Sequence, residues 1–248
     1  MKPYIAISGV VNLEQIKAIG EIKEKLSIFQ NNYDLCIGFQ VSKRTLYGGQ
    51  NSKRQPDINT LQALCNRTKE LGMIPSIHYH TKTKSNLVSE IIDLNKEVQY
   101  DYLQLNVKDC SPKILQYPDR KLIYKGSFNY DTNRNFNVNI NSEFTEVEPF
   151  IDYLMFDTSH GKGLPFNIRQ VFYYGFITEC YDFDYVIAGG FNPINIEERL
   201  IDLRILLKPF SIDAESGLRT KDDLLNLDSC ASYLRSCDKI LGSLDNVH

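Results

Sequence analysis

The chain has 248 residues, of which 42% are hydrophobic and 24% are charged, and its formal net charge at pH 7 is -3. This composition is typical of a globular protein with a large core, and the small net charge with scattered lysines excludes a polyelectrolyte surface, so no nucleic-acid partner is expected. No apolar run approaches the roughly 20 residues that a membrane-spanning helix needs, so no membrane partner is expected either.

The N-terminal pattern and the cysteines indicate the compartment. The first residues lead directly into a predicted strand with no signal-peptide layout, which predicts a cytoplasmic protein. The cysteines form no Cys-x-x-Cys pair and have no histidine spacing suited to zinc; they are Cys36, Cys65, Cys110, Cys180, Cys230 and Cys237. We therefore expect reduced thiols, no bound metal and no cofactor.

Eight short apolar runs predict β-strands. They occupy residues 4–7, 33–41, 74–80, 102–107, 122–125, 153–157, 185–188 and 210–213. Helical patterns are predicted between most of them, at residues 56–71, 87–94, 112–117, 167–181, 192–203 and 220–241. This alternation, in a chain of about 250 residues, favours a single (β/α)8 barrel domain over residues 1–248, with a closed parallel sheet, over an open doubly wound sheet.

Three connections have features of their own. A helix is predicted to begin after Asn12, which Gln15 complements in a capping box, and its apolar face continues to Phe29. A polar loop that holds Arg44 is predicted after the second strand. An irregular, asparagine-rich insertion at residues 129–141 is predicted after the fifth strand.

Alternation along the strands predicts which side chains enter the barrel. If Ile5 and Ile7 face the helices, the residues between and after them face the interior. The polar residues that the same parity places inside are Ser8, Ser76, His78, His80, Gln104, Asn106, Asp157, Ser211 and Asp213. Packing alone does not require so polar a layer, so it predicts a pocket for a small polar ligand, with Gln104 and Asn106 among its contacts.

Two strand-to-helix turns near the C-terminus predict a phosphate site. Gly189-Gly190 follows the seventh strand and Ser216-Gly217 follows the eighth; we call them the cradle turns. Small residues let backbone N–H groups and helix N-termini approach an anion, as in the last two loops of a (β/α)8 barrel. A pair of ordinary tight turns is the alternative, because Ala-Gly-Gly alone is a weak signal.

The ionisable residues of the predicted pocket each have a structural alternative. Asp157 is either an acid or base of the site or a cap for the segment after it. His78 and His80 are either catalytic or hydrogen-bonded to neighbouring Gln and Asn side chains. Arg44 is either a solvated cation or a ligand for an anionic group, since its loop leaves a barrel strand.

The strand-end motifs also carry a family resemblance. In chain order they are Ile7-Ser-Gly-Val-Val-Asn-Leu-Glu14, Ile37-Gly-Phe-Gln-Val41 with Ser42-Lys-Arg44, Gln104-Leu105, Leu154-Met-Phe-Asp157 with His160-Gly-Lys-Gly163, Ala188-Gly-Gly-Phe-Asn-Pro193, and Asp213-Ala-Glu-Ser-Gly217 with Lys221-Asp222. In order and spacing they resemble the phosphoribosylanthranilate isomerases, the barrel enzymes of tryptophan synthesis, along nearly the whole chain.

The resemblance implies a role for each matching residue. Asp157 matches the general acid, Arg44 the arginine that holds the anthranilate carboxylate, and Asp213 a substrate-contacting carboxylate. The cradle turns and Gly163 match the phosphate site. We expect a phosphorylated sugar as the ligand, bound by a monomer or a homodimer.

One residue departs from the family pattern: Ser8 stands where the family has the cysteine that acts as general base. A thiol ionises near pH 8.5, whereas an alcohol stays protonated without a neighbouring base, so the replacement is expected to cost about 10²- to 10⁴-fold in proton abstraction. Asn106-Val107 also stands where His-Gly is usual. Another group, His78 or His80, then serves as the base, or the chemistry differs, or the protein only binds its ligand.

Three functions therefore stay open. The first is an aldose-ketose isomerase that acts on a phosphorylated aminosugar by Amadori rearrangement. The second is a non-catalytic barrel that binds a phosphorylated ligand, and the third is another sugar-phosphate enzyme of the same fold, since fold does not fix the reaction. A histidine or lysine within hydrogen-bond reach of Ser8 favours catalysis, and on the first reading Ser8→Cys is expected to raise activity on phosphoribosylanthranilate.

Overall fold

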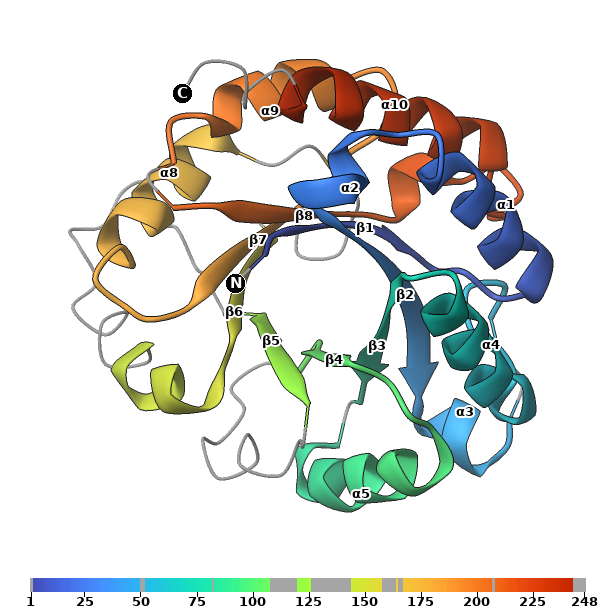
Figure 1. The fold of residues 1–248 in the computed structure, drawn as a ribbon. Coiled ribbons are helices and arrows are strands. Elements are labelled where there is room, and N and C mark those ends of the chain that lie inside the picture. Colours follow the sequence, from blue (N-terminus) through green and yellow to red (C-terminus); the bar gives the residue numbers. More distant parts are fainter. Residues whose placement is uncertain are drawn as a thin grey trace.

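The eight predicted strands close into one parallel barrel (Figure 1). The structure is a computed structural model that describes residues 2–49, 52–81, 83–107, 120–125, 144–157, 164, 167–206 and 208–242. Each strand pairs with the next, and the last pairs with the first. The strands are β1 (Tyr4–Ser8), β2 (Asp34–Ser42), β3 (Ile74–His80), β4 (Tyr102–Leu105), β5 (Lys121–Lys125), β6 (Tyr153–Asp157), β7 (Asp184–Ala188) and β8 (Phe210–Ala214). The predicted (β/α)8 fold is confirmed.

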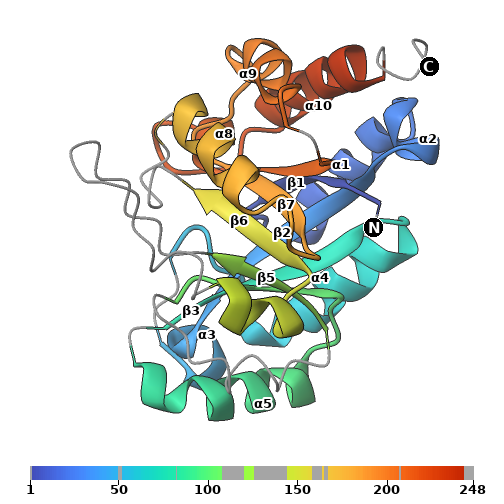
Figure 2. The ribbon, with the colours of Figure 1, turned by 90° about the vertical axis from the view of Figure 1, so that its left-hand side faces the viewer.

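The helices lie outside the ring of strands (Figures 1 and 2). They are α1 (Leu13–Lys23), α2 (Ile28–Asn31), α3 (Lys43–Tyr47), α4 (Ile58–Glu70), α5 (Leu87–Glu97), α8 (Ile168–Ile177), α9 (Ile196–Leu203) and α10 (Leu227–Leu241). Three short 3₁₀ helices complete the described elements: η1 (Lys84–Asn86), η2 (Glu148–Phe150) and η3 (Ser216–Leu218). No helix of the described residues has the length and apolar character to span a membrane.

Local capping corrects two predicted connections. The loop predicted after the second strand is the short helix α3, because Ser42 and Thr45 form a reciprocal capping box in which the Ser42 N–H donates to Thr45 Oγ1 at 3.2 Å. The helix predicted to reach Phe29 ends at Lys23, and Ile28–Asn31 forms the separate helix α2.

Capping also moves two predicted helix starts towards the C-terminus. Asp57 accepts a hydrogen bond from the Asn59 N–H at 2.8 Å, so α4 begins after Asp57 and not at residue 56. Asn226 accepts from the Ser229 N–H at 3.0 Å, so α10 begins at Leu227 instead of residue 220. The predicted helix at 112–117, the insertion at 129–141, Cys110 and the loop that holds Gly163 lie outside the described residues.

Two apolar layers separate the inside of the barrel from its outside. Ile5 and Ile7 belong to the large cluster between strands and helices, as alternation predicts. The cluster inside the barrel is different and consists of Tyr4, Ala6, Cys36, Tyr102, Ile123, Tyr153, Met155, Val186 and Ala188. The interior is therefore apolar and aromatic below, which leaves its upper layer, at the carboxyl ends of the strands, for polar side chains.

Candidate active site at the carboxyl ends of the strands

Two inward-facing carboxylates lie in one row across three neighbouring strands. The sheet register pairs Asp157 of β6 with Ala188 of β7, and Ala188 with Asp213 of β8. The Cα atoms of Asp157 and Asp213 are two strand spacings apart, a distance of about 10 Å. Because Ala188 has only a methyl group, the space between the two carboxylates is not filled by a large side chain from β7.

Ser8 is hydrogen-bonded to one of these carboxylates. Its hydroxyl donates to Asp213 Oδ1 over 2.6 Å, and Ser8 itself is buried. The pKa of Asp213 is raised to about 6, chiefly by burial and to a smaller extent by the charge of Asp157, while the Ser8 hydrogen bond and the charge of Lys125 act in the opposite direction. The hydrogen-bond partner of Ser8 is therefore a carboxylate that titrates close to neutral pH.

The other carboxylate, Asp157, is paired with a lysine. Lys125 Nζ at the end of β5 lies 2.5 Å from Asp157 Oδ2, and the two side chains are 22% and 8% exposed. The pair is thus largely removed from water, and the ammonium holds a proton directly against the carboxylate. Sequence analysis did not include Lys125 in the site, although the parity that places Ile123 inside also places Lys125 inside.

His78 lies close to Ser8, because the residue between them on β2, Gly38, has no side chain. A Cβ on Gly38 of β2 would lie 2.3 Å from Ser8 Oγ and 2.8 Å from His78 Nε2. Any other residue at this position would collide with both groups, so glycine is what lets them approach each other. Burial lowers the pKa of His78 to about 4, against a smaller raising effect of the Glu215 charge, so the imidazole is neutral at pH 7.

His80 belongs to a hydrogen-bonded chain along the rim of the barrel. Gln40 Nε2 donates to Glu215 Oε2 at 2.9 Å, and Gln40 Oε1 contacts His80 Nε2. A carboxylate with two oxygen atoms can only accept, so Gln40 presents its carbonyl oxygen to His80 and makes His80 Nε2 a donor. His80 is exposed, and desolvation by its surroundings nevertheless lowers its pKa to about 4, with smaller contributions from His78 and Lys125.

Gln104 and Asn106 continue the same chain. Gln104 Nε2 lies 3.0 Å from Asn106 Oδ1, and Asn106 Nδ2 lies 3.1 Å from His80 Nε2. Polar contacts therefore run without a break from Gln104 through Asn106 to the His80 ring. These two predicted substrate contacts therefore sit beside His80, on the β3–β4 side of the barrel.

Two arginines after β2 occupy different places. Arg44, the predicted anion ligand, is exposed on α3 and pairs with no other described residue. Arg54, which sequence analysis did not single out, donates from Nη1 to Glu215 Oε1 at 3.0 Å and to Ser216 Oγ at 3.3 Å. It also pairs with Asp223. The arginine that the structure brings to a cradle turn is thus Arg54.

The cradle turns lie against each other. Gly189 and Gly190 have positive φ angles of 130° and 62°, and the side-chain amide of Asn195 donates to Gly190 O at 2.9 Å, which fixes the first turn. A Cβ on Gly217 would lie 2.1 Å from Phe191 O, so only glycine lets the second turn pack this closely on the first. Neither the Gly190 nor the Gly217 N–H forms a backbone hydrogen bond to another described residue.

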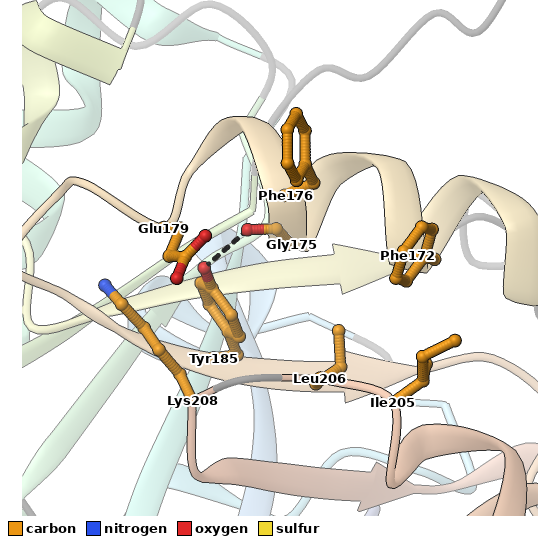
Figure 3. A pocket seen from close by; sticks show the side chains of 8 residues that line it. All are labelled: Phe172, Gly175, Phe176, Glu179, Tyr185, Ile205, Leu206 and Lys208. Carbon is orange, nitrogen blue, oxygen red and sulfur yellow. Dashed lines mark hydrogen bonds between the residues drawn. The ribbon is translucent and has the colours of Figure 1, made fainter.

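A separate cavity lies on the outside of the barrel. Its volume is about 260 Å³, and it is lined by Phe172, Gly175, Phe176, Glu179, Tyr185, Ile205, Leu206 and Lys208 (Figure 3). Tyr185 donates its hydroxyl to Gly175 O at 2.9 Å, and Lys208 donates to the carbonyl of Phe183 at 3.4 Å. With those polar groups already paired, the cavity offers apolar surface and no converging catalytic groups. The described residues also contain no cluster of three or more His, Cys, Asp or Glu side chains placed to hold a metal ion.

Comparison with solved structures supports the fold. The phosphoribosyl anthranilate isomerase from Thermus thermophilus is 18% identical, with a TM-score of 0.61 over 97% of this chain and 99% of that one. An isomerase of the same name in complex with reduced 1-(o-carboxyphenylamino)-1-deoxyribulose 5-phosphate is 16% identical, with a TM-score of 0.63 over 96% and 99% of the two chains. The N-acetylneuraminic acid synthetase from Leptospira borgpetersenii is 13% identical and reaches 0.60 over 99% and 86%.

These similarities establish the barrel fold. They do not identify the reaction, which has to be inferred from the residues of the site. Identities below 20% show a shared fold, and a synthetase matches almost as well as the isomerases. No protein-family model and no curated protein sequence matches the chain.

Proposed function

We propose that the chain is a divergent phosphoribosylanthranilate isomerase, which converts its aminosugar phosphate by Amadori rearrangement in tryptophan biosynthesis in the cytoplasm. The observation that carries the proposal is the row Asp157–Ala188–Asp213, in which two carboxylates flank the small side chain of Ala188 beside the cradle turns. An isomerisation needs an acid and a base that act on different atoms of one bound sugar, and this row supplies two such groups without bringing them into contact.

The cradle turns are proposed to hold the substrate phosphate. The Gly190 and Gly217 N–H groups are donors on adjacent turns, and no lysine is required to bind an anion there. Gly163 is proposed as a further contact of the phosphate. Binding at the end of β7 and β8 places the sugar over Ala188, within reach of both carboxylates.

Asp157 is proposed as the general acid, and the Lys125 ammonium as the group that stabilises the carboxylate which remains. The carboxyl group protonates the ring oxygen of the ribose, the C1–O bond breaks, and an iminium ion forms between C1 and the aniline nitrogen. The Lys125 ammonium, 2.5 Å from Asp157, supplies positive charge where the carboxylate is left after the proton has gone.

The next step removes the proton from C2 of the iminium ion. The electron pair of the C2–H bond forms the C1–C2 double bond and neutralises the nitrogen, which gives an enolamine. The enolamine then gains a proton at C1 and loses the C2 hydroxyl proton to become the ketose. The site that receives the C2 proton lies at the Ser8–Asp213 pair, opposite Asp157 in the row.

The anthranilate ring is proposed to lie towards β2, β3 and β4. Arg44 is the proposed ligand of its carboxylate, and it has no competing partner among the described residues. Gln104 and Asn106 are proposed to contact the substrate from the β4 end, where their amides are already oriented by His80.

A binding protein without activity is the second candidate, because Ser8, a hydrogen-bond donor to Asp213, is not itself a base. The deciding measurement is kcat/KM on phosphoribosylanthranilate for the wild type and for Asp157→Asn. We expect activity in the wild type and a loss of about 10²- to 10⁴-fold in the variant, as for other general acids.

The control is Asp228→Asn, which makes the same chemical change on the exposed first turn of α10 and should leave kcat/KM unchanged. Binding of the reduced product analogue named above is measured on all three proteins. An inactive wild type that still binds the analogue would favour the binding protein, and an inactive wild type that does not bind it would point to another substrate.

A further inference from the structure

We infer that Asp213 is the base that removes the C2 proton, and that Ser8 is a positioning residue which orients the Asp213 carboxylate. The inference rests on the proposed isomerase function and names the group that replaces the missing cysteine. It follows from the 2.6 Å contact in which Ser8 Oγ donates to Asp213 Oδ1. A hydroxyl that donates its proton to a carboxylate occupies one oxygen of that carboxylate and directs the other.

The second oxygen of Asp213 is the proposed proton acceptor. Among the described residues, Ser8 provides the one side-chain hydrogen bond to Asp213. Ser8 on β1 holds Oδ1 from one side of β8, so Oδ2 is the oxygen left for the sugar that is proposed to lie over Ala188 of β7, on the other side. Ser8 cannot play this part itself, because an alcohol has no usable pKa near neutrality, and its proton is already directed at Asp213.

The two histidines fit the role of base less well. His78 is only 2% exposed, and its Nε2 points over Gly38 into the same small space as Ser8 Oγ. His80 Nε2 is a donor to Gln40, because the chain that starts at the Glu215 carboxylate fixes the direction of each amide. The exposed His80 ring is therefore a hydrogen-bond donor at the rim.

The protonation state of Asp213 supports the assignment. A pKa of about 6 leaves the carboxylate ionised at pH 7, and it makes Asp213 a stronger base than an ordinary aspartate. The ionisable groups that interact electrostatically with Asp213 are Tyr4 of β1, Cys36 of β2, Lys125 of β5, Asp157 of β6 and Tyr233 of α10. Of these, Asp157 raises the pKa of Asp213 and Lys125 lowers it, so their effects oppose each other.

The proton transfer balances without any further reactant. The C2–H bond breaks, its proton forms an O–H bond with Asp213 Oδ2, and its electron pair moves into the C1–C2 bond while the iminium nitrogen becomes neutral. Asp213 then returns a proton to C1 as the enolamine becomes the ketose, and the C2 hydroxyl proton passes to the Asp157 carboxylate, which regains the proton that it gave to the ring oxygen. A single carboxyl group serves both transfers, and no electrons leave the substrate.

The test compares kcat/KM on phosphoribosylanthranilate for the wild type, Asp213→Asn, Ser8→Ala and Ser8→Cys. We expect Asp213→Asn to lose about 10²- to 10⁴-fold, and Ser8→Ala to lose no more than about tenfold, because the base remains. Ser8→Cys is expected to add nothing. Ser236→Ala is the matched control, because it removes a serine hydroxyl that donates to another carboxylate, that of Glu197, on the outer helices, and it should stay within about twofold of the wild type.

A pH profile separates positioning from a structural effect. The wild-type kcat/KM should fall on the acid side as a group with a pKa of about 6 becomes protonated. The Ser8 hydrogen bond stabilises the ionised carboxylate, so its removal raises the pKa of Asp213 and moves the acid limb of Ser8→Ala to higher pH. Ser236→Ala should leave that limb in place.

Three results would overturn the inference. Ser8→Ala could lose as much activity as Asp213→Asn with Ser8→Cys far above the wild type, which would make the first-strand side chain the base. The acid limb could stay fixed in Ser8→Ala, or Asp213→Asn could remain active. An active wild type with active Asp213→Asn removes only this inference, whereas a wild type inactive on phosphoribosylanthranilate removes the proposed function as well.

Discussion

The two ends of the barrel interior are both buried, yet burial has opposite chemical consequences in them. The lower interior is formed by Tyr4, Tyr102 and Tyr153, whose ring centroids lie 5.4 to 5.6 Å apart. The upper interior is formed by Ser8, His78, Lys125, Asp157 and Asp213, at the carboxyl ends of the strands. The same sheet positions both sets, so the difference between them is one of residue type.

Loss of water disfavours the charged form of every ionisable group. A tyrosine is neutral at pH 7, so burial raises the pKa of Tyr102 to about 12 and moves it further from neutrality. An aspartate is charged at pH 7, so burial raises the pKa of Asp213 to about 6 and moves it towards neutrality. Desolvation thus keeps the tyrosines of the lower interior neutral at pH 7. In the upper interior it brings the pKa of Asp213 close enough to neutrality for proton transfer.

The largest expected effect is on the lower interior. Tyr153→Ala removes a fully buried ring that contacts two others and should lower the free energy of unfolding by about 3–5 kcal/mol. Urea unfolding followed by circular dichroism measures the change. Phe176→Ala is the control, because that ring is 69% exposed on α8, and an equal loss in both variants would show that the tyrosine cluster is not a special source of stability.

The next effect has the opposite sign and concerns the upper interior. The folded-state pKa of Asp213, about 6, lies above the value of about 3.9 in an unfolded chain, so its ionisation destabilises the fold above pH 6. That penalty disappears as the pH falls from 6 to 4, because the folded state takes up the proton first. Asp213→Asn should therefore be more stable than the wild type by about 2–3 kcal/mol at pH 7.

The measurement is the free energy of unfolding of Asp213→Asn and of the wild type at pH 7 and at pH 4. The gain should be present at pH 7 and absent at pH 4. A gain that is equal at both values would mean that the amide packs better than the carboxyl group, and that the ionisation of Asp213 has no part in it.

The sequence predicts many of the residues that face the barrel interior, because the alternation of side chains along a strand is a local property. Ser8, Asp157 and Asp213 were found from parity at the ends of predicted strands. Lys125 obeys the same rule, and its inward position follows from that of Ile123 on the same short strand. Helix boundaries were less predictable because single caps decide them, as at Asn226.

The rim of the site could not be predicted in the same way. Arg54 reaches Glu215 and Ser216, which are more than 150 positions further along the chain, through the path of the loop after β2. Neither the length nor the composition of that loop determines where the guanidinium group of Arg54 lies. The contact between Gln40 of β2 and Glu215, which follows β8, likewise forms only once β1 pairs with both strands and the barrel has closed.

Gly38→Ala tests how tightly the upper interior is packed. Its new methyl group would lie 2.3 Å from Ser8 Oγ and 2.8 Å from His78 Nε2, and overpacking of this kind costs about 1–3 kcal/mol. We expect a lower unfolding free energy together with a lower kcat/KM, because Ser8 must turn away from Asp213. Gly20→Ala is the control for activity, since a Cβ there would press on the Leu71 side chain outside the barrel, 2.9 Å away. Normal activity in Gly38→Ala would show that the Ser8–Asp213 contact is dispensable.

The smallest effect is expected for Tyr153→Phe, which keeps the ring of the lower interior and removes only its hydroxyl. That hydroxyl lies 3.4 Å from the Tyr102 hydroxyl, longer than the usual 2.5–3.0 Å of such a hydrogen bond, so little bonding is lost. The change in unfolding free energy should stay below about 1 kcal/mol, and it should not depend on pH between 5 and 8, because burial holds the pKa of Tyr153 far above that range. The measurement is urea unfolding at several pH values. A loss as large as that of Tyr153→Ala would place the stability of this end in its hydroxyl groups, and the two ends of the interior would then differ less than their residue types suggest.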